Sequence, residues 1–392
     1  MEKYEKALYE MINELEEKHL CFPFVITKEE LNKYTKKLVK NNPIKDDYDF
    51  VYDANCIIKK AMGTYDSHTK ASYKKLVGSN IPIKLKMENN KFYIIKTDKE
   101  HKDMELSQVL KINGIDVNKL KDELDNMISY STKGWFIGCV EYYLREVYYL
   151  RALPSIDNKC KEITYTIKDQ NNNIKNVSFD ADKNYERIEV AKENYTYKII
   201  DNTLVITYSS CEEREKNEMN NFVKKIDKTS KDNDIKNYII DVRNNTGGNS
   251  SIIKPLIEYL KGKDIITLVN SSVFSSGRWA VNDLKSIGSK LVGTELGTAL
   301  NCFGNSSGII ESEECNNIRL RYSTSYFFLK NDILEGYYTQ EDFTKHKNDH
   351  EVINQSYYNP DIYVENTIDD YKNGTDRQLE VALKELNKTK EK

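Results

Sequence analysis

The sequence predicts a multidomain α+β protein whose C-terminal half is an α/β core built on a largely parallel sheet. With 392 residues, the chain is longer than one compact core needs. Its apolar residues follow helical spacing near the N-terminus and strand-like alternation further on. From Tyr195 onward, strand and helix patterns alternate. Repeated strand, helix, strand units need crossover connections and therefore favour parallel pairing.

The N-terminal region, residues 1–77, is predicted to form a small helical domain. One face of its first helix carries apolar residues at helical spacing: Leu8, Met11, Ile12 and Leu15. The segment Thr27-Lys-Glu-Glu30 has the pattern of a capping box, in which threonine and glutamate satisfy each other's backbone N–H groups. A second helix is therefore expected to begin there.

The next two regions are predicted to be mainly β structure. In residues 78–155, Ile81, Ile83 and Leu85 alternate with other residues, and an Asn89-Asn90 turn follows. Residues 156–190 are interpreted as a β-hairpin linker, because two strand-like runs flank an Asn-rich turn. These runs are Glu162–Ile167 and Ile174–Phe179.

Residues 191–380 are predicted to be the α/β core, followed by a flexible tail over the lysine-rich residues 381–392. Strands are expected over 203–208, 238–242 and 265–269, and another from 291. The intervening helices are expected over 212–226, 250–260 and 277–287. This order gives the crossover pattern of a parallel sheet.

Composition and charge exclude several classes of protein. The 59 basic and 62 acidic residues are interspersed and give a net charge of −3, so no nucleic-acid footprint is present. The seven cysteines are scattered without zinc or redox spacing, and no metal or organic cofactor is expected. No apolar run is long enough for a membrane span, and no signal segment is seen. A cytoplasmic location is therefore expected.

Two motifs in the core carry the chemistry. Asp241–Asn249 contains a glycine pair directly behind the buried strand Tyr238–Ile240. Glycines at a strand-to-helix turn leave backbone N–H groups unblocked and aimed at one point, which suits a developing oxyanion. The second motif, Phe274–Trp279, places serines at the start of the next helix as a candidate nucleophile. A Ser-Ser-Gly turn is also the pattern of an ordinary helix N-cap.

Three successive segments resemble the core of the S41 peptidases, which include C-terminal processing proteases and tricorn core proteases. These are IIDVRNNTGG, LVNSSVFSSGRWA and LVGTELGTALNCFG. Upstream, VLKINGIDV is similar to the PDZ-like module of that family, and Tyr65-Asp-Ser-His-Thr69 also fits. The resemblance implies a crotonase/Clp-like catalytic core, a helical N-terminal domain and a PDZ-like β module that admits an extended peptide.

The resemblance also implies a nucleophile. In the family, the serine lies three residues ahead of a glutamate, and here Arg278 stands at the glutamate position. Ser275 is therefore the aligned nucleophile, and Ser276 is the alternative. Processing proteases take a lysine about two dozen residues later as base, but Ala299 stands near that place. A serine and lysine dyad is not expected.

The tricorn-like branch takes a histidine in an Asp-x-His-Thr setting, which implies that His68 is the general base. Glu335 is the candidate third member of the site, and Asp66 is expected to cap a turn. The resemblance further implies that Gly247 or Gly248, together with the Ser276 N–H, holds the oxyanion.

The predicted function is that of a serine endopeptidase acting on peptides or unfolded proteins through an acyl-enzyme. Two alternatives remain open. The changes at Arg278 and Ala299 also fit a peptide-binding pseudoenzyme without turnover. A crotonase-like acyl-CoA enzyme would share the strand-to-glycine geometry, but nothing in the sequence indicates a nucleotide site. The sequence leaves the oligomeric state open.

Overall fold

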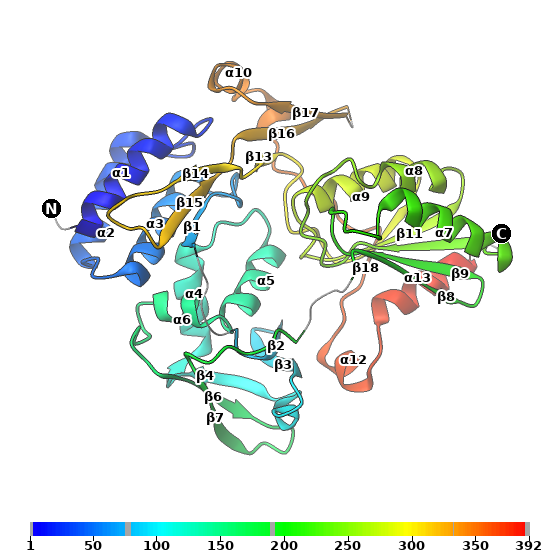
Figure 1. Cartoon of the computed structure of the whole chain (residues 1–392), viewed down its shortest axis with the longest axis horizontal. Helices are drawn as coiled ribbons and strands as arrows, with labels where there is room; N and C mark the ends of the chain where they lie inside the picture. Colours follow the sequence, from blue (N-terminus) through cyan, green and yellow to red (C-terminus); the bar gives the residue numbers. More distant parts are fainter. Residues whose placement is uncertain (1–2, 75–79, 189–192, 332, 389–392) are drawn as a thin grey trace. The chain divides into compact units, whose positions relative to one another are not determined.

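The computed structural model describes residues 3–74, 80–188, 193–331 and 333–388, and the chain divides into two compact units (Figure 1). The first unit comprises Met1–Ile188 together with Leu300–Ser356. The second comprises Glu189–Ala299 together with Tyr357–Lys392. Both units contain helices and sheets, which agrees with the predicted mixed α/β class.

The first unit begins with three helices. They form one side of an apolar core, called here the upper core, whose other side comes from residues 300–356. The capping box predicted at Thr27 is confirmed, because the Thr27 side chain accepts from the Glu30 N–H and the Glu30 side chain accepts from the Thr27 N–H. Asp46 caps the third helix. The helices are α1 (Lys3–Lys18), α2 (Lys28–Asn41) and α3 (Asp47–Met62).

Residues 300–356 return to these helices and complete the upper core. Their buried side chains, among them Phe303, Leu320 and Tyr326, share one apolar cluster with Leu8 and Phe50 of the helices. Together with β1 from the N-terminal region, residues 300–356 form two small antiparallel sheets, in the orders β1-β15-β14 and β13-β16-β17. The elements are β1 (Lys70–Tyr73), β13 (Cys302–Gly304), β14 (Gly308–Ile310), β15 (Ile318–Tyr322), β16 (Ser325–Lys330), β17 (Ile333–Tyr337), α10 (Gln340–His346) and α11 (His350–Ile353).

The lower half of the first unit is a larger antiparallel sheet with helices on it, in the order β2-β3-β4-β6-β7 (Figure 1). The hairpin predicted over 162–179 is present, but it is part of this sheet, because β6 pairs with β4 and buries Ile163, Tyr165 and Ile167. The elements are β2 (Ile83–Glu88), β3 (Lys91–Thr97), the short helix η1 (Lys102–Met104), β4 (Gln108–Ile112), β5 (Ile115–Asp116), α4 (Val117–Met127), α5 (Lys133–Tyr143), α6 (Val147–Ala152), β6 (Glu162–Lys168) and β7 (Ile174–Asp180).

The second unit is a six-stranded sheet in the order β18-β12-β11-β10-β9-β8, and all neighbours pair in parallel except β8 with β9. The apolar residues of its inner strands β9 to β12 are buried, which agrees with a parallel sheet covered by helices. The elements are β8 (Tyr195–Ile200), β9 (Thr203–Tyr208), α7 (Met219–Asp232), β10 (Asn237–Asp241), α8 (Lys254–Leu260), β11 (Asp264–Val269), α9 (Ser276–Ser286), β12 (Lys290–Gly293), β18 (Ile362–Tyr363), α12 (Ile368–Asn373) and α13 (Arg377–Lys388).

The structure differs from the predicted boundaries at three places. The hairpin of residues 156–190 is not a separate linker, because β4 and β6 hydrogen-bond across the expected boundary. Residues 300–356 lie outside the unit that holds the rest of the expected core. Residues 381–388 are not a flexible tail, because α13 buries Leu379, Ala382 and Leu386 against the sheet at helical spacing. The tail residues 389–392 lie outside the described residues.

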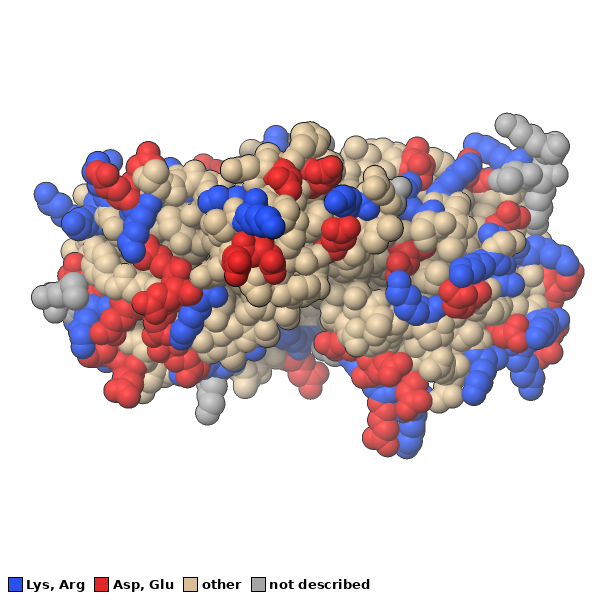
Figure 2. All heavy atoms as spheres, turned by 90° about the horizontal axis from the view of Figure 1, so that it is seen from above, with Lys and Arg blue, Asp and Glu red and all other residues tan. Residues whose placement is uncertain are grey.

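The surface agrees with the composition. Acidic and basic side chains are mixed over the face in Figure 2. All seven cysteines are free thiols. Within the described ranges, no helix is both long enough and apolar enough to cross a bilayer.

The packing of residues 300–356 with the N-terminal helices predicts the effect of Phe303→Ala. Phe303 is fully buried and contacts the rings of Phe24, Tyr326 and Phe343. Its truncation should lower the free energy of unfolding by about 3–5 kcal/mol. Hydrogen exchange followed by mass spectrometry should show faster exchange in α1 and α3 but not in β9 to β11. The matched variant Leu284→Ala, in the core of the second unit, should show the opposite pattern. If either variant speeds exchange both in α1 and α3 and in β9 to β11, the division of the chain into two units would be contradicted.

Candidate functional site

Two backbone segments of the second unit, the glycine loop at Asn245–Gly248 and the serine turn at Ser275–Gly277, approach each other more closely than side chains would permit. A Cβ on Gly247 would lie 2.8 Å from the Ser275 Cβ and 2.9 Å from the Ser276 nitrogen. A Cβ on Gly277 would lie 2.4 Å from the carbonyl oxygen of Asn245. Gly247 also has a φ of +110°, which side-chain residues rarely adopt. The glycines are thus required by contact, and the motifs predicted to act together lie side by side.

The Asn245 side chain holds these segments in register. It is fully buried, and its Nδ2 donates to the carbonyl oxygen of Tyr208 at 3.0 Å. Its Oδ1 accepts from the Gly247 N–H at 3.0 Å and lies 3.4 Å from the Cys211 Sγ. The Asn245 carbonyl oxygen accepts the N–H of Phe274 at 3.0 Å, directly before Ser275. Asn245 therefore connects the end of β9 and the glycine loop through its side-chain amide, and the serine turn through its backbone carbonyl.

Ser275 occupies a strained position at the start of α9. Its φ of +50° and ψ of −125° lie where residues with a side chain are rarely found. Its side chain makes no capping hydrogen bond to the helix, although it stands at the N-cap position. The N-cap interpretation of the Ser-Ser-Gly turn therefore does not account for its hydroxyl. A serine on a sharp, strained strand-to-helix turn is the geometry that exposes a nucleophilic Oγ.

Ser276 has a different environment. Its Oγ donates to the carbonyl oxygen of Gly248 at 2.6 Å and so helps to attach the glycine loop to α9. Its N–H is in the first turn of α9, where helical N–H groups have no acceptor within the helix. The positive end of the helix dipole adds to the attraction of this N–H for an anion. The Gly247 N–H is engaged by Asn245, whereas Gly248 is exposed.

Arg278 lies at the family's glutamate position and is almost completely buried. Its guanidinium donates to the carbonyl oxygen of Ala299 and lies 4.0 Å from the centre of the Trp279 ring. Arg278 therefore ties α9 to the segment in which processing proteases place their lysine. The sequence alone indicated that Arg278 and Ala299 depart from the family pattern. It did not indicate that these two residues contact each other.

Asp241 and Arg243 anchor the end of β10. Arg243 forms ion pairs with Asp241 and with Asp376, both at 2.7 Å, and also donates to Gln378 of α13. Burial would raise the pKa of Asp376, but the hydrogen bond and charge of Arg243 hold it below its ordinary value. No local sequence pattern indicated that Asp376 contacts Arg243, because Asp376 lies 133 residues further along the chain, directly before the last helix.

His68 belongs to the first unit, on a loop held by the carboxylate of Asp66. The Asp66 Oδ1 accepts the N–H of His68 at 2.8 Å and the N–H of Thr69 at 2.9 Å, as expected of a turn cap. The Ser323 hydroxyl, at the end of β15, also donates to Oδ1 at 3.0 Å. The carboxylate thus fixes the backbone of His68 against the returning chain.

The second buried partner of Asp66 is His19, which the sequence analysis missed. The His19 Nε2 lies 3.0 Å from the Asp66 Oδ2, and both side chains are fully buried. The Cys21 N–H donates to the His19 Nδ1, so in the neutral ring Nε2 carries the proton. Burial alone would raise the pKa of Asp66, but the hydrogen bonds from His19 and Thr69 hold it well below its ordinary value.

The predicted residues therefore fall into two groups. Ser275, Ser276, Gly247 and Gly248 lie together in the second unit. His68 and Glu335 belong to the first unit, where Glu335 is exposed on β17 opposite Phe328 of β16. The roles of these residues in catalysis stay predictions.

The backbone strain at Ser275 predicts an unusual order of stability among variants. Glycine adopts positive φ without steric cost, whereas alanine keeps the Cβ. Ser275→Gly should therefore be about 1–2 kcal/mol more stable to urea than Ser275→Ala. The matched pair Ser276→Gly and Ser276→Ala should show the reverse order, because Ser276 is helical. Equal stability of the two Ser275 variants would contradict the strained geometry.

The environment of Asp66 predicts a pH-dependent loss of stability. Because its folded pKa is lowered, its contribution is present above the unfolded pKa, roughly 3.9, and is lost as pH falls toward the folded pKa. The substitution Asp66→Asn should lower the free energy of unfolding by about 3–5 kcal/mol near pH 7. Measured by urea unfolding, the difference in the free energy of unfolding between Asp66→Asn and wild type should become smaller below about pH 4.

Asp53 is a matched control of opposite sign. Burial, with a smaller effect of the Asp49 charge, raises the pKa of Asp53 to about 7. Its ionisation therefore disfavours the folded state as pH rises toward 7, and Asp53→Asn should gain stability relative to wild type over that interval. If the difference in the free energy of unfolding between Asp66→Asn and wild type does not change with pH, the lowered pKa of Asp66 would be contradicted.

The sequence and the structure were compared with those of known proteins. Residues 202–278 match the sequence model of peptidase family S41. Mature CPAF complexed with lactacystin aligns with 99% of this chain and 98% of its own, at 10% identity and a TM-score of 0.62. Mature CPAF aligns with 99% of this chain and 97% of its own, at 10% identity and a TM-score of 0.58. The photosystem II D1 C-terminal processing protease aligns over 93% and 94%, at 9% identity and a TM-score of 0.46.

No curated protein matches the sequence. The two CPAF structures share the fold over nearly the whole chain. The matched segment contains the glycine loop and the Ser275 turn, and a peptidase family supports a proteolytic function. This segment of the chain is thus similar to peptidase family S41, and the chain shares its fold with the two CPAF structures.

Proposed function

We propose that the chain is a serine endopeptidase in which Ser275 is the nucleophile and His68 the general base. The observation that carries the proposal is the strained Ser275 backbone beside the glycine loop. Strain of about 1–3 kcal/mol persists only where the surrounding structure enforces it, and such positions cluster at active sites. The environment of the Ser276 hydroxyl, which donates to Gly248, favours Ser275 over Ser276.

The oxyanion donors in this proposal are the N–H groups of Ser276 and Gly248. The Gly247 N–H is engaged by the Asn245 side chain, so the role shared between the glycines falls to Gly248. The Ser276 N–H follows the nucleophile directly and lies at the positive end of α9. Two such donors, fixed before the reaction, stabilise the negative charge that develops on the substrate carbonyl.

The reaction then follows the acyl-enzyme route. The Ser275 Oγ forms a bond to the substrate carbonyl carbon while its proton passes to His68. The carbon–nitrogen bond breaks as His68 returns the proton to the leaving amine. Water then attacks the ester and releases the acid. No metal or organic cofactor is part of this proposal, and the proposed orienting partner of His68 is Glu335.

Substrates are proposed to be peptides or unfolded proteins. We assign a PDZ-like role in admitting an extended chain to the β2 to β7 sheet of the first unit, because strand addition to a sheet edge binds peptides of many sequences. A peptide-binding protein without turnover is the second candidate. The observation that favours it is Arg278, which is buried at the family's glutamate position and bonded to Ala299.

Labelling with a fluorophosphonate tests the proposal. Wild type and the variants Ser275→Ala, Ser276→Ala and His68→Ala would be labelled, the adduct located by peptide mass spectrometry, and casein cleavage followed in parallel. We expect an adduct on Ser275 that is lost in Ser275→Ala and slowed at least about 100-fold in His68→Ala, because the base activates the hydroxyl.

Ser276→Ala should keep the adduct and most of the cleavage, since only its hydroxyl bond to the glycine loop is lost. An adduct on Ser276 would overturn the assignment of the nucleophile while keeping the enzyme. Folded wild type without adduct or cleavage would favour the binding protein.

A further inference from the structure

Three cations of the first unit gather on one face of the small sheet that follows His68. Lys70 of β1 pairs directly with Arg321 of β15, and Ser72 pairs with Arg319. Residues two apart on a strand share a face, so Lys70, Arg319 and Arg321 point to the same side. The opposite side buries Ala71 and Leu320 in the core. We refer to Lys70, Arg319 and Arg321 as the cationic face.

The cationic face has no acidic partner among the residues that the structure describes. Lys70, Arg319 and Arg321 take part in no ion pair and no hydrogen bond of their side chains there. The Nε atoms of Arg319 and Arg321 are covered from solvent and unbonded. The neighbouring Lys74, by contrast, pairs with Glu311 at 3.0 Å. An unpaired buried donor has an energetic cost, which a bound acceptor would remove.

Like charges directly across two strands also repel. Lys70 and Arg321 are such a pair, with Cβ atoms about 5 Å apart in antiparallel strands generally. Surrounding protein and, more weakly, the Arg321 charge lower the pKa of the Lys70 ammonium below its usual value, although part of the side chain is exposed. An anion placed over the face would stabilise all three cations together.

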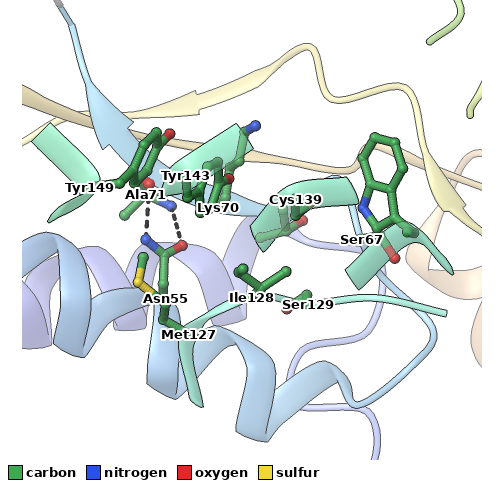
Figure 3. Close-up of a pocket in the computed structure, with 12 residues that line it drawn as sticks. Asn55, Ser67, Lys70, Ala71, Met127, Ile128, Ser129, Cys139, Tyr143 and Tyr149 are labelled. Atoms are coloured by element: carbon green, nitrogen blue, oxygen red, sulfur yellow. Dashed lines mark hydrogen bonds between the residues drawn. The ribbon is translucent and has the colours of Figure 1, made fainter. Parts of the chain in front are cut away.

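A small pocket adjoins the face. It encloses about 40 Å³, and Lys70 and Ser67 line it together with Cys139, Tyr143 and Trp135 (Figure 3). The Ser67 Oγ is covered from solvent and has no hydrogen-bond partner among the described residues. Ser67 and Lys70 flank His68 along the chain. The hydroxyl and the cations therefore lie beside the proposed general base, on the same short segment of chain.

From these observations we propose that the cationic face is a binding site for a carboxylate of the peptide substrate. The inference rests on the proposed function, because it assigns the substrate class of the same enzyme. Planar guanidinium groups bind carboxylates through paired hydrogen bonds, and two of them with an ammonium exceed what one surface charge provides. The carboxylate comes either from an acidic side chain or from the C-terminus of the peptide.

The test measures binding without turnover. Full-length Ser275→Ala protein would be titrated against one fluorescein-labelled peptide in three forms: with a free C-terminus and no acidic residue, with an amidated C-terminus and one glutamate, and with neither carboxylate. We expect at least one carboxylate form to bind about tenfold more tightly than the neutral form at low salt, and this preference to decrease at high salt. The form that binds identifies the source of the carboxylate.

Charge variants in the same background locate the site. Arg319→Gln and Arg321→Gln should each remove most of the preference, and Arg321→Lys should restore part of it, because the charge returns without the paired donors. Lys37→Gln is the matched control, since Lys37 is an exposed residue of α2 in the same unit. It should leave the preference unchanged. If an arginine variant does not fold, Lys70→Gln tests the same face with an exposed side chain.

The outcomes separate this inference from the proposed function. Equal binding of the three peptides, or a preference that survives Arg319→Gln and Arg321→Gln, would overturn the carboxylate site even if Ser275 is labelled by the fluorophosphonate. A preference that depends on the arginines in a chain that is never labelled would keep the site and overturn the peptidase assignment.

Discussion

The second unit depends on the close approach of three backbone segments around one buried asparagine. Asn245 can bond to the end of β9, the glycine loop and the serine turn only because Gly247 and Gly277 have no side chain. The approach forces Ser275 into its strained conformation and places the Ser276 N–H at the glycine loop. The parallel strands supply the frame, since β9, β10 and β11 end at the same edge. The geometry of the proposed nucleophile is therefore a product of backbone packing.

The first unit uses a buried charge for a similar purpose. The Asp66 carboxylate joins the end of α1, through His19, to the His68 loop and to the end of β15, through Ser323. Removing a carboxylate from water is costly, and here five hydrogen bonds to one carboxylate offset that cost. Ser323 comes from residues 300–356, so this hydrogen bond adds to the apolar packing that joins the segment to the first unit.

The sequence predicted those features that arise from local patterns. The glycine pair, the serine turn and the alternation of strand and helix are contained within short windows, and the structure has each of them. The His19 contact spans 47 residues and the Ser323 contact 257, so no local pattern could indicate either. The same reason explains the hairpin, whose strand β6 pairs with residues of β4 that lie 53 to 60 positions earlier in the chain. The lysine-rich end was interpreted by its charge, whereas its apolar residues at helical spacing decide its structure.

The proposed base, His68, differs in its surroundings from the other four histidines. Both ring nitrogens of His19 are engaged, by Asp66 and by the Cys21 N–H. His101 and His346 are each bound to an aspartate three residues away, and His350 is exposed on α11. At Ala299, near the place where the resemblance to processing proteases would put a lysine, this chain contributes a backbone carbonyl to Arg278. A lysine there would have to share its surroundings with a buried guanidinium, and like charges in a low dielectric repel strongly. With Arg278 in that region, the proposed mechanism takes its base from another part of the chain, and the backbone of the proposed base His68 is fixed by Asp66.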